Sequence, residues 1–159
     1  IIKGSPKEIE IFDLDLKDSD VRITSEEPFK ETSSDVDLSS ANFIVTVGRG
    51  IENKENIPMM EKFVNTVGAE LGSSRPVVDM GILPKSRLVG SSGHTVSPDL
   101  YLAVGLSGAI QHVVAMKGSK KIMGINTDRD APIFEISDYA VIGDLFEVIP
   151  EITKKLSKT

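Results

Sequence analysis

Residues 101–112 constrain the fold more than any other part of the sequence. Five residues of strand character run into a turn of small residues, and this turn opens a helix that carries Gln111 and His112 in its first exposed turn. In such a unit, the unpaired N–H groups at the helix start point into the crevice at the carboxyl end of the strand. Ser107 can cap the helix, and Gly108 lets a ligand approach the backbone closely. The unit predicts either a phosphate-binding corner or an ordinary strand-to-helix corner with a surface histidine.

From residue 42 onward, apolar runs of strand length alternate with amphipathic runs of helix length. The expected elements are a strand at 43–47, a helix at 55–71 ended by Gly72, a strand at 75–80, an ordered binding loop at 81–98, a helix to about 116, a strand at 121–126, a strand region at 133–134 and 139–142, and a final helix capped by Asp144. The helix that ends near 116 is expected to bury Ile110, Val113 and Val114. This order predicts an α/β fold, with a mainly parallel sheet, helices on both faces and ligands at the carboxyl ends of the strands.

Residues 1–40 follow a different pattern. Apolar and acidic residues alternate over 9–16, and 21–24 continue with the same period, which predicts two half-buried strands. The segment 25–40 is rich in Ser, Asp, Glu and Thr and is expected to be a linker. Two strands cannot bury their own apolar face, so this arm needs a partner sheet or another chain. We therefore expect an arm and linker at 1–40 and one domain at 41–159.

Composition narrows the range of functions. The net charge of −6 argues against a nucleic-acid-binding surface, which requires a basic face. The lack of Cys excludes disulfides and thiolate metal sites, and two histidines fall short of a His-rich metal cluster. Because the sequence has neither an apolar run of about 18 residues nor a signal-peptide pattern, we expect no stable membrane insertion and a cytoplasmic location. The chain begins with Ile1 rather than Met, so we expect a fragment, a processed chain or the ordered part of a longer protein.

The first expected strand ends in Gly48-Arg49-Gly50. This segment begins like a dinucleotide-binding fingerprint, but Asn53 stands where the third glycine belongs, so the match is weak. Arg49 comes just after the strand end, where a guanidinium can pair with phosphate. A solvated turn arginine is the alternative interpretation.

Further polar residues are expected at the same crevice. Arg75 needs an anionic partner there, which is either Asp79, Asp99 or a ligand. Ser91 and Ser92 offer hydroxyls in a glycine-rich segment that, taken alone, is most often a turn. No arrangement of nucleophile, base and acid stands out. Two arginines, a histidine and a helix start in an otherwise acidic chain predict a site for an anionic nucleotide cofactor, where negative charge on the cofactor ring is favoured.

Six separated motifs agree, in order and spacing, with one known family. They are Gly48-Arg49-Gly50; residues 72–75; Val89-Gly90; residues 101–112, which include Ser107-Gly108-Ala109-Ile110-Gln111-His112; the group Ile125-Asn126, Ala131-Pro132-Ile133-Phe134 and Asp138-Tyr139; and Gly143-Asp144-Leu145-Phe146. Over about residues 42–156 the chain resembles the C-terminal FAD domain of the electron transfer flavoprotein alpha subunit. This resemblance implies a three-layer Rossmann-like fold of the DHS-like NAD/FAD-binding type. Residues 1–28 resemble the last strands of the family's N-terminal domain and the connection that follows.

The resemblance also implies roles for individual residues. Arg49 and the helix start at Ser107 and Gly108 would hold the FAD pyrophosphate, with Ser74 nearby. Arg75 would lie against the isoalloxazine, Ser92 would bond near flavin N5, His112 would bond near the C2 carbonyl, and Asn126 and Asp144 would bind the adenosine end. The full set of expected cofactor-binding residues is Arg49, Ser74, Arg75, Val89, Gly90, Ser91, Ser92, Ser107, Gly108, Ala109, Ile110, Gln111, His112, Asn126, Asp144 and Leu145.

One segment departs from the family pattern. The family usually has Gly-Gln-Thr-Gly followed by Lys, whereas this chain has Gly90-Ser91-Ser92-Gly93 followed by His94. Ser92 can replace the threonine hydroxyl, but Ser91 cannot reach as far as a glutamine. The departure bears on the redox tuning of the flavin more than on its binding.

The resemblance implies an electron carrier without substrate turnover of its own, which passes electrons from flavoprotein dehydrogenases to an acceptor and pairs with a beta-type subunit. A homodimer formed through the N-terminal arm is a further possible assembly. Two alternatives remain. One is an enzyme domain of related fold that acts on NAD or belongs to a thiamine-cofactor protein, with His112 as its base. The other is a truncated relative that has lost the flavin and serves as a regulatory or partner-binding module.

Overall fold

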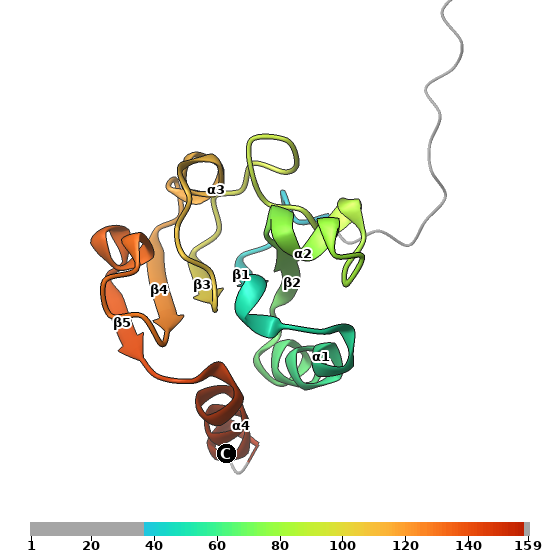
Figure 1. The fold of residues 1–159 in the computed structure, drawn as a ribbon, viewed down its shortest axis with the longest axis vertical. Helices are drawn as coiled ribbons and strands as arrows, with labels where there is room; N and C mark the ends of the chain where they lie inside the picture. Colours follow the sequence, from blue (N-terminus) through green and yellow to red (C-terminus); the bar gives the residue numbers. More distant parts are fainter. Residues whose placement is uncertain (1–36, 158–159) are drawn as a thin grey trace, which may run out of the picture. The chain divides into compact units, whose positions relative to one another are not determined.

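The computed structural model describes residues 37–157, and the expected strands at 9–16 and 21–24 lie outside this range. Five parallel strands form one sheet: β1 (Phe43–Val47), β2 (Glu70–Ser73), β3 (Leu100–Val104), β4 (Lys121–Asn126) and β5 (Tyr139–Ile142). Their order across the sheet is β2-β1-β3-β4-β5, which runs from right to left in Figure 1. The chain moves outward from β1 on one side and from β3 on the other, so β1 and β3 flank a topological switch point. Ligands of such sheets bind at that point, beyond the carboxyl ends of the strands.

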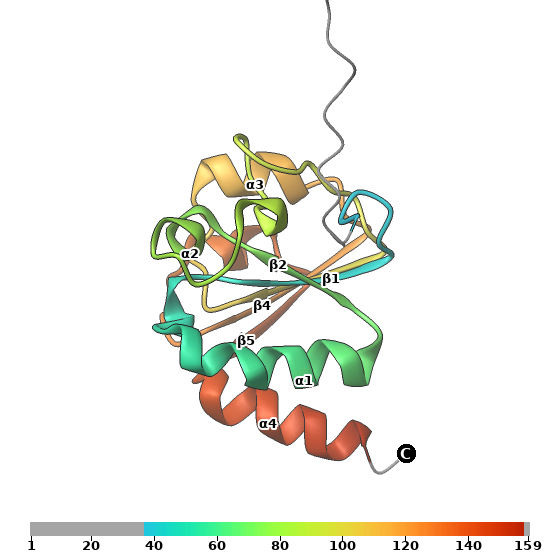
Figure 2. The same cartoon turned by 90° about the vertical axis from the view of Figure 1, so that its right-hand side faces the viewer.

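Helices cover both faces of the sheet. α1 (Ile57–Val67) and α4 (Leu145–Leu156) pack together on one face, and α3 (Ile110–Met116) lies on the other (Figure 2). A short helix, α2 (Arg75–Asp79), follows β2. The predicted three-layer α/β fold with a parallel sheet is therefore confirmed. No helix within residues 37–157 has both the length and the apolar character to cross a membrane.

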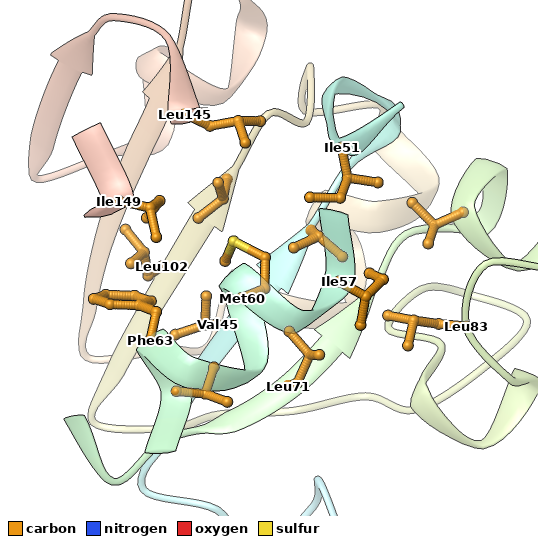
Figure 3. Packing of buried hydrophobic residues seen from close by; sticks show 14 of the residues in the cluster. Val45, Ile51, Ile57, Met60, Phe63, Leu71, Leu83, Leu102, Leu145 and Ile149 are labelled. Carbon is orange, nitrogen blue, oxygen red and sulfur yellow. The ribbon is translucent and has the colours of Figure 1, made fainter. Parts of the chain in front are cut away.

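The hydrophobic core consists of two clusters, one on each face of the sheet. Val45 and Leu102 point toward α1 and α4, where they meet Met60 and Ile149 (Figure 3). Neighbouring residues of the same strands point the other way, into a cluster that contains Ile44, Tyr101 and Met116. Leu38 is fully buried in this second cluster. Burial on both faces explains why β1 and β3 are largely apolar, with the buried Thr46 as the polar residue of β1.

The prediction for residues 55–80 was partly wrong. The helix ends at Val67, because Gly68 adopts the left-handed conformation (φ 66°, ψ 37°) and its N–H bonds to the Val64 carbonyl. Gly72 does not end a helix, since it lies in β2, opposite Thr46 of β1. Arg75 starts a helix instead of a strand. Pro76 fits there, because the missing N–H of proline costs nothing in the first turn of a helix.

The predicted orientation of α3 was also wrong. Ile110 and Val114 are 71% and 46% exposed, and the buried residues are His112, Ala115 and Met116. Ser107 is not the cap, because the helix begins at Ile110 after Ala109 and has no side-chain cap. In the region after β4, residues 133–134 belong to a 3₁₀ turn, Pro132–Ile136, so that only Tyr139–Ile142 is a strand.

The predicted cap of α4 is confirmed, and it yields a first testable prediction. The Asp144 carboxylate accepts a hydrogen bond from the Phe146 N–H at 2.8 Å. We expect Asp144→Ala to lower the free energy of unfolding by about 1 kcal/mol, because one N–H at the helix start loses its acceptor. Chemical denaturation measures this change. Asp99→Ala is the control: it removes a carboxylate paired only with the exposed Lys120, and it should cost less than half as much.

Candidate functional site

A cavity of about 850 Å³ lies at the switch point, next to the ends of β1, β3 and β4. Its volume is in the range typical of small-molecule and cofactor sites. The wall comes from the segments after the strands, the start of α2 and the loop before β3. The lining residues are Arg49, Gly50, Glu52, Ser74, Arg75, Pro76, Leu88, Val89, Gly90, Ser91, Ser92, Gly105, Leu106, Ser107, Gly108, Ala109, Gln111, His112, Asn126, Asp128 and Ala131.

The cavity brings together most of the residues expected at the site, from Arg49 to Asn126. Three of the expected residues do not line it. Ile110 faces solvent, Asp144 is engaged as the cap of α4, and Leu145 is buried in the cluster beneath α1 and α4. The expected role of these three residues in binding a cofactor stays a prediction.

Arg49 lies on a loop that is held against the turn after β3. The Gly48 N–H donates to the Val104 carbonyl at 2.8 Å, and the Gly50 N–H donates to the Gly105 carbonyl at 3.0 Å. A Cβ on Gly48 would lie 2.3 Å from the Gly105 oxygen, so these glycines allow two backbones to touch. The Arg49 side chain is exposed and forms no ion pair with any carboxylate of residues 37–157. Its charge is therefore available to an anion in the cavity.

Arg75 has the partner that the sequence suggested. Its Nε lies 2.7 Å from Oδ1 of Asp79, one helical turn further along α2, and both side chains are exposed. Asp99 instead pairs with Lys120 at 2.6 Å. Nη1 of Arg75 lies 3.4 Å from the Ser92 hydroxyl, which connects α2 with the loop before β3. Two points fix this loop: the Val89 N–H bonds to the Ser73 carbonyl, and the Ser91 N–H bonds to the Gln111 carbonyl.

The turn between β3 and α3 is packed against the 3₁₀ turn that begins at Pro132. The Ile133 N–H donates to the Ser107 carbonyl at 2.9 Å, and Gly108 has φ +90°. Within the described part of the chain, the N–H groups of Gly108 and Ala109 form no backbone hydrogen bond. Both residues line the cavity, so their amides are donors for a ligand there.

His112 is buried, at 6% exposure, and lines the cavity, so the alternative of a surface histidine was wrong. Its Nε2 lies 2.8 Å from the hydroxyl of Tyr101, while Nδ1 is buried without a hydrogen-bond partner among residues 37–157. Burial lowers the pKa of His112 to about 4, and the backbone of Val89 opposes this shift in part. The imidazole is therefore neutral at pH 7. Among the lining residues of the described part of the chain, Arg49 and Arg75 carry the positive charge.

Asn126 connects two loops of the cavity wall. Its Nδ2 donates to the Leu106 carbonyl at 3.0 Å, and its Oδ1 accepts from the Asp128 N–H at 2.9 Å. Both ends of the carboxamide are thus engaged in hydrogen bonds, and these bonds set the distance between the segments after β3 and β4.

Two acidic lining residues, Glu52 and Asp128, were missing from the expected set. Glu52 has an unusual backbone conformation (φ 65°, ψ −59°), and around it the Asn53 N–H bonds to the Ile51 carbonyl at 2.7 Å. Both residues follow closely on a strand end, a sequence signal that could have identified them. Leu88 and Ala131 had no such signal, because tertiary packing alone brings them to the cavity.

Comparison with known proteins agrees with this geometry. The family described as the electron transfer flavoprotein FAD-binding domain matches residues 37–117. The alpha subunit of the electron transfer flavoprotein from Paracoccus denitrificans is 50% identical over 120 residues, which are 76% of this chain and 39% of that protein. The corresponding protein from Bacillus subtilis is 40% identical over 156 residues, 98% of this chain and 48% of that protein. The mitochondrial protein from Arabidopsis thaliana is 48% identical over 120 residues, 76% of this chain and 33% of that protein.

The chain thus spans a third to about half of the length of these relatives. The family match covers the residues from the start of the described region to the end of α3, a segment that includes most of the cavity wall. The chain belongs to the electron transfer flavoprotein alpha-subunit family and carries its FAD-binding domain.

Proposed function

We propose that this chain holds FAD in the cavity at the switch point and serves as an electron carrier without substrate turnover of its own. The observation that carries the proposal is that Arg49, which forms no ion pair with a carboxylate of residues 37–157, lines one cavity together with the unbonded N–H groups of Gly108 and Ala109. An unpaired guanidinium and free backbone amides attract an anionic group, and a dinucleotide pyrophosphate has that charge. Bound FAD supplies a centre that takes up and releases electrons.

The residues on the wall fit such a cofactor. Arg49 and the amides of Gly108 and Ala109 are donors for the pyrophosphate. The buried Nδ1 of His112, which has no partner within residues 37–157, fits a carbonyl acceptor of the flavin ring. A buried polar atom without a hydrogen bond costs about 1–3 kcal/mol, which a ligand with the matching group recovers.

The remaining roles follow the shape of the cavity. Arg75 and Ser92, which are 3.4 Å apart, would lie beside the isoalloxazine. Ser74 and Ser107 would offer hydroxyls near the pyrophosphate. The end of the cavity at Asn126 and Asp128 would take the adenosine.

The geometry of His112 disfavours the alternative of an NAD-dependent or thiamine-dependent enzyme domain. A general base is most effective when its pKa lies near the working pH. The pKa of His112 is about 4, and its Nε2 is already bonded to Tyr101. His112 was the only candidate base that the sequence offered.

We further propose that the carrier works with a beta-type subunit, because its relatives are named as alpha subunits. As the family resemblance implies, it would accept electrons from flavoprotein dehydrogenases. The division into an arm and linker at 1–40 and an FAD-binding domain at 41–159 belongs to the same proposal, and so does the cytoplasmic location. An arm-mediated homodimer is the alternative assembly. Size-exclusion chromatography of the chain, alone and with a beta-type subunit, distinguishes the two assemblies.

Titration of the purified chain with FAD tests the cofactor site, with flavin absorbance and fluorescence as readouts. We expect Arg49→Gln to weaken FAD binding by about 10- to 100-fold, because one charge-assisted hydrogen bond to phosphate is lost. Arg129→Gln removes the same charge from a side chain that does not line the cavity, and it should leave the affinity within about threefold. Equal affinities of wild type and Arg49→Gln would contradict the assignment of Arg49.

A further inference from the structure

Tyr101 and His112 form a buried polar pair between the central strand β3 and α3. The phenolic oxygen and Nε2 are 2.8 Å apart, and the rings meet edge to face with their centroids 6.0 Å apart and their planes at 60°. Tyr101 is completely buried, and His112 lines the cavity. A side chain on the central strand of a sheet has little room to move. The phenol is thus a fixed point against which the imidazole is oriented.

Only one proton can lie between the two rings. Burial raises the pKa of Tyr101 far above its usual value, so the phenol keeps its proton, and the imidazole is neutral at pH 7. Either the phenol donates to Nε2 and the imidazole carries its proton on Nδ1, or Nε2 donates to the phenolic oxygen and Nδ1 is bare. The structure must favour one of these two tautomers.

The surroundings of the phenol distinguish the tautomers. Within residues 37–157, the Tyr101 hydroxyl has one hydrogen-bond partner, Nε2 of His112. Because the phenol is completely buried and keeps its proton, that proton needs an acceptor inside the protein, and Nε2 provides it. If Nε2 donated instead, the phenolic O–H would be buried without an acceptor.

We infer that Tyr101 is the positioning residue of His112: its hydroxyl donates to Nε2, fixes the orientation of the ring and holds the imidazole as the Nδ1–H tautomer. This inference rests on the proposed function, since it names how His112 is prepared for the flavin. With Nε2 occupied, Nδ1–H is the group left to bond with an acceptor that enters the cavity. A flavin carbonyl fits this donor, whereas the opposite tautomer would present a lone pair to an oxygen.

The experiment uses the full chain labelled with ¹⁵N-histidine. Long-range ¹H–¹⁵N correlation spectra at pH 7 identify which imidazole nitrogen of His112 carries the proton, with and without added FAD. We expect Nδ1–H in the wild type. In Tyr101→Phe, which keeps the ring volume, we expect a mixture of tautomers and an FAD dissociation constant about 3- to 10-fold higher. The potential of bound FAD should shift in this variant as well.

Thr46→Val is the matched control, because it removes a buried hydroxyl of β1 that lies on the same face of the sheet as Tyr101 and has no hydrogen-bond partner among residues 37–157. We expect this variant to keep the Nδ1–H tautomer. A change of tautomer in Tyr101→Phe alone would then come from the lost bond to Nε2 and not from the removal of any buried hydroxyl. An Nε2–H tautomer in the wild type would overturn the inference without any variant. An unchanged tautomer in Tyr101→Phe would also overturn it. If the wild type binds no FAD, the proposed function fails, while the spectra of the free chain still decide the role of Tyr101.

Discussion

Acidification from pH 7 to pH 4 is expected to destabilise the folded domain by roughly 3 kcal/mol through His112 alone. Burial lowers the pKa of His112 from 6.5 to about 4, so the unfolded chain binds a proton at a higher pH than the folded chain does. The stability that the neutral imidazole contributes is fully present above pH 6.5. It is lost as the pH falls toward 4, and it changes little below that value.

Urea denaturation at a series of pH values from 7 to 4 measures this loss, and His112→Asn isolates it. Carboxylates titrate in the lower part of the same range, so the relevant quantity is the difference between the pH profiles of wild type and variant. We expect the variant to lack the 3 kcal/mol decline, whatever its stability at pH 7. Parallel profiles for wild type and His112→Asn would show that the imidazole is not held neutral by burial.

The sheet and the place of the cavity could be predicted because both depend on local pattern. β1 and β4 match the expected ranges, since largely buried strands appear in the sequence as short, mostly apolar runs followed by small or polar residues. The carboxyl ends of parallel strands share one edge of the sheet. Arg49 and Ser107, just beyond strand ends, and Asn126, the last residue of β4, were therefore expected at one crevice, and all three line the cavity.

Short elements were not predictable in the same way. α2 and α3 have five and seven residues, too few for a helical period to stand out, and Val77 and Val78 favour a strand when considered alone. Tertiary packing decides both cases. The edge of β1 that faces away from β3 pairs with residues 70–73, which makes this segment a strand. His112 of α3 points inward because the Tyr101 hydroxyl offers the imidazole a hydrogen bond.

The roles of individual side chains were the least predictable part. The side chains of Asn126 and Asp144 bond to the backbone of neighbouring segments, which the sequence did not indicate, and their expected contact with the adenosine stays a prediction. A sequence pattern reports that a polar residue follows a strand. It does not report which nearby N–H or carbonyl will take the side chain.

Gly108→Ala is expected to lower the free energy of unfolding by about 3 kcal/mol, which corresponds to a melting temperature about 10 °C lower. Gly108 has φ +90°, a conformation that an alanine adopts only with strain. A Cβ at this position would also lie 2.4 Å from the nitrogen and 2.7 Å from the Cα of Ile133. To make room, the turn that begins at Pro132 must move, and the hydrogen bond from Ile133 to the Ser107 carbonyl breaks.

Gly81→Ala separates the two contributions. Gly81 has φ +69°, but an added Cβ would meet no atom within 4 Å, so only the backbone strain of about 1 kcal/mol applies. Thermal unfolding of both variants by circular dichroism measures the difference. FAD titration should show weakened binding for Gly108→Ala and normal binding for Gly81→Ala, because only Gly108 lines the cavity. Equal losses of stability in the two variants would contradict this prediction. They would show that the turn at Ile133 moves to accommodate the added Cβ without loss of stability, so that its packing does not hold the turn after β3 rigid.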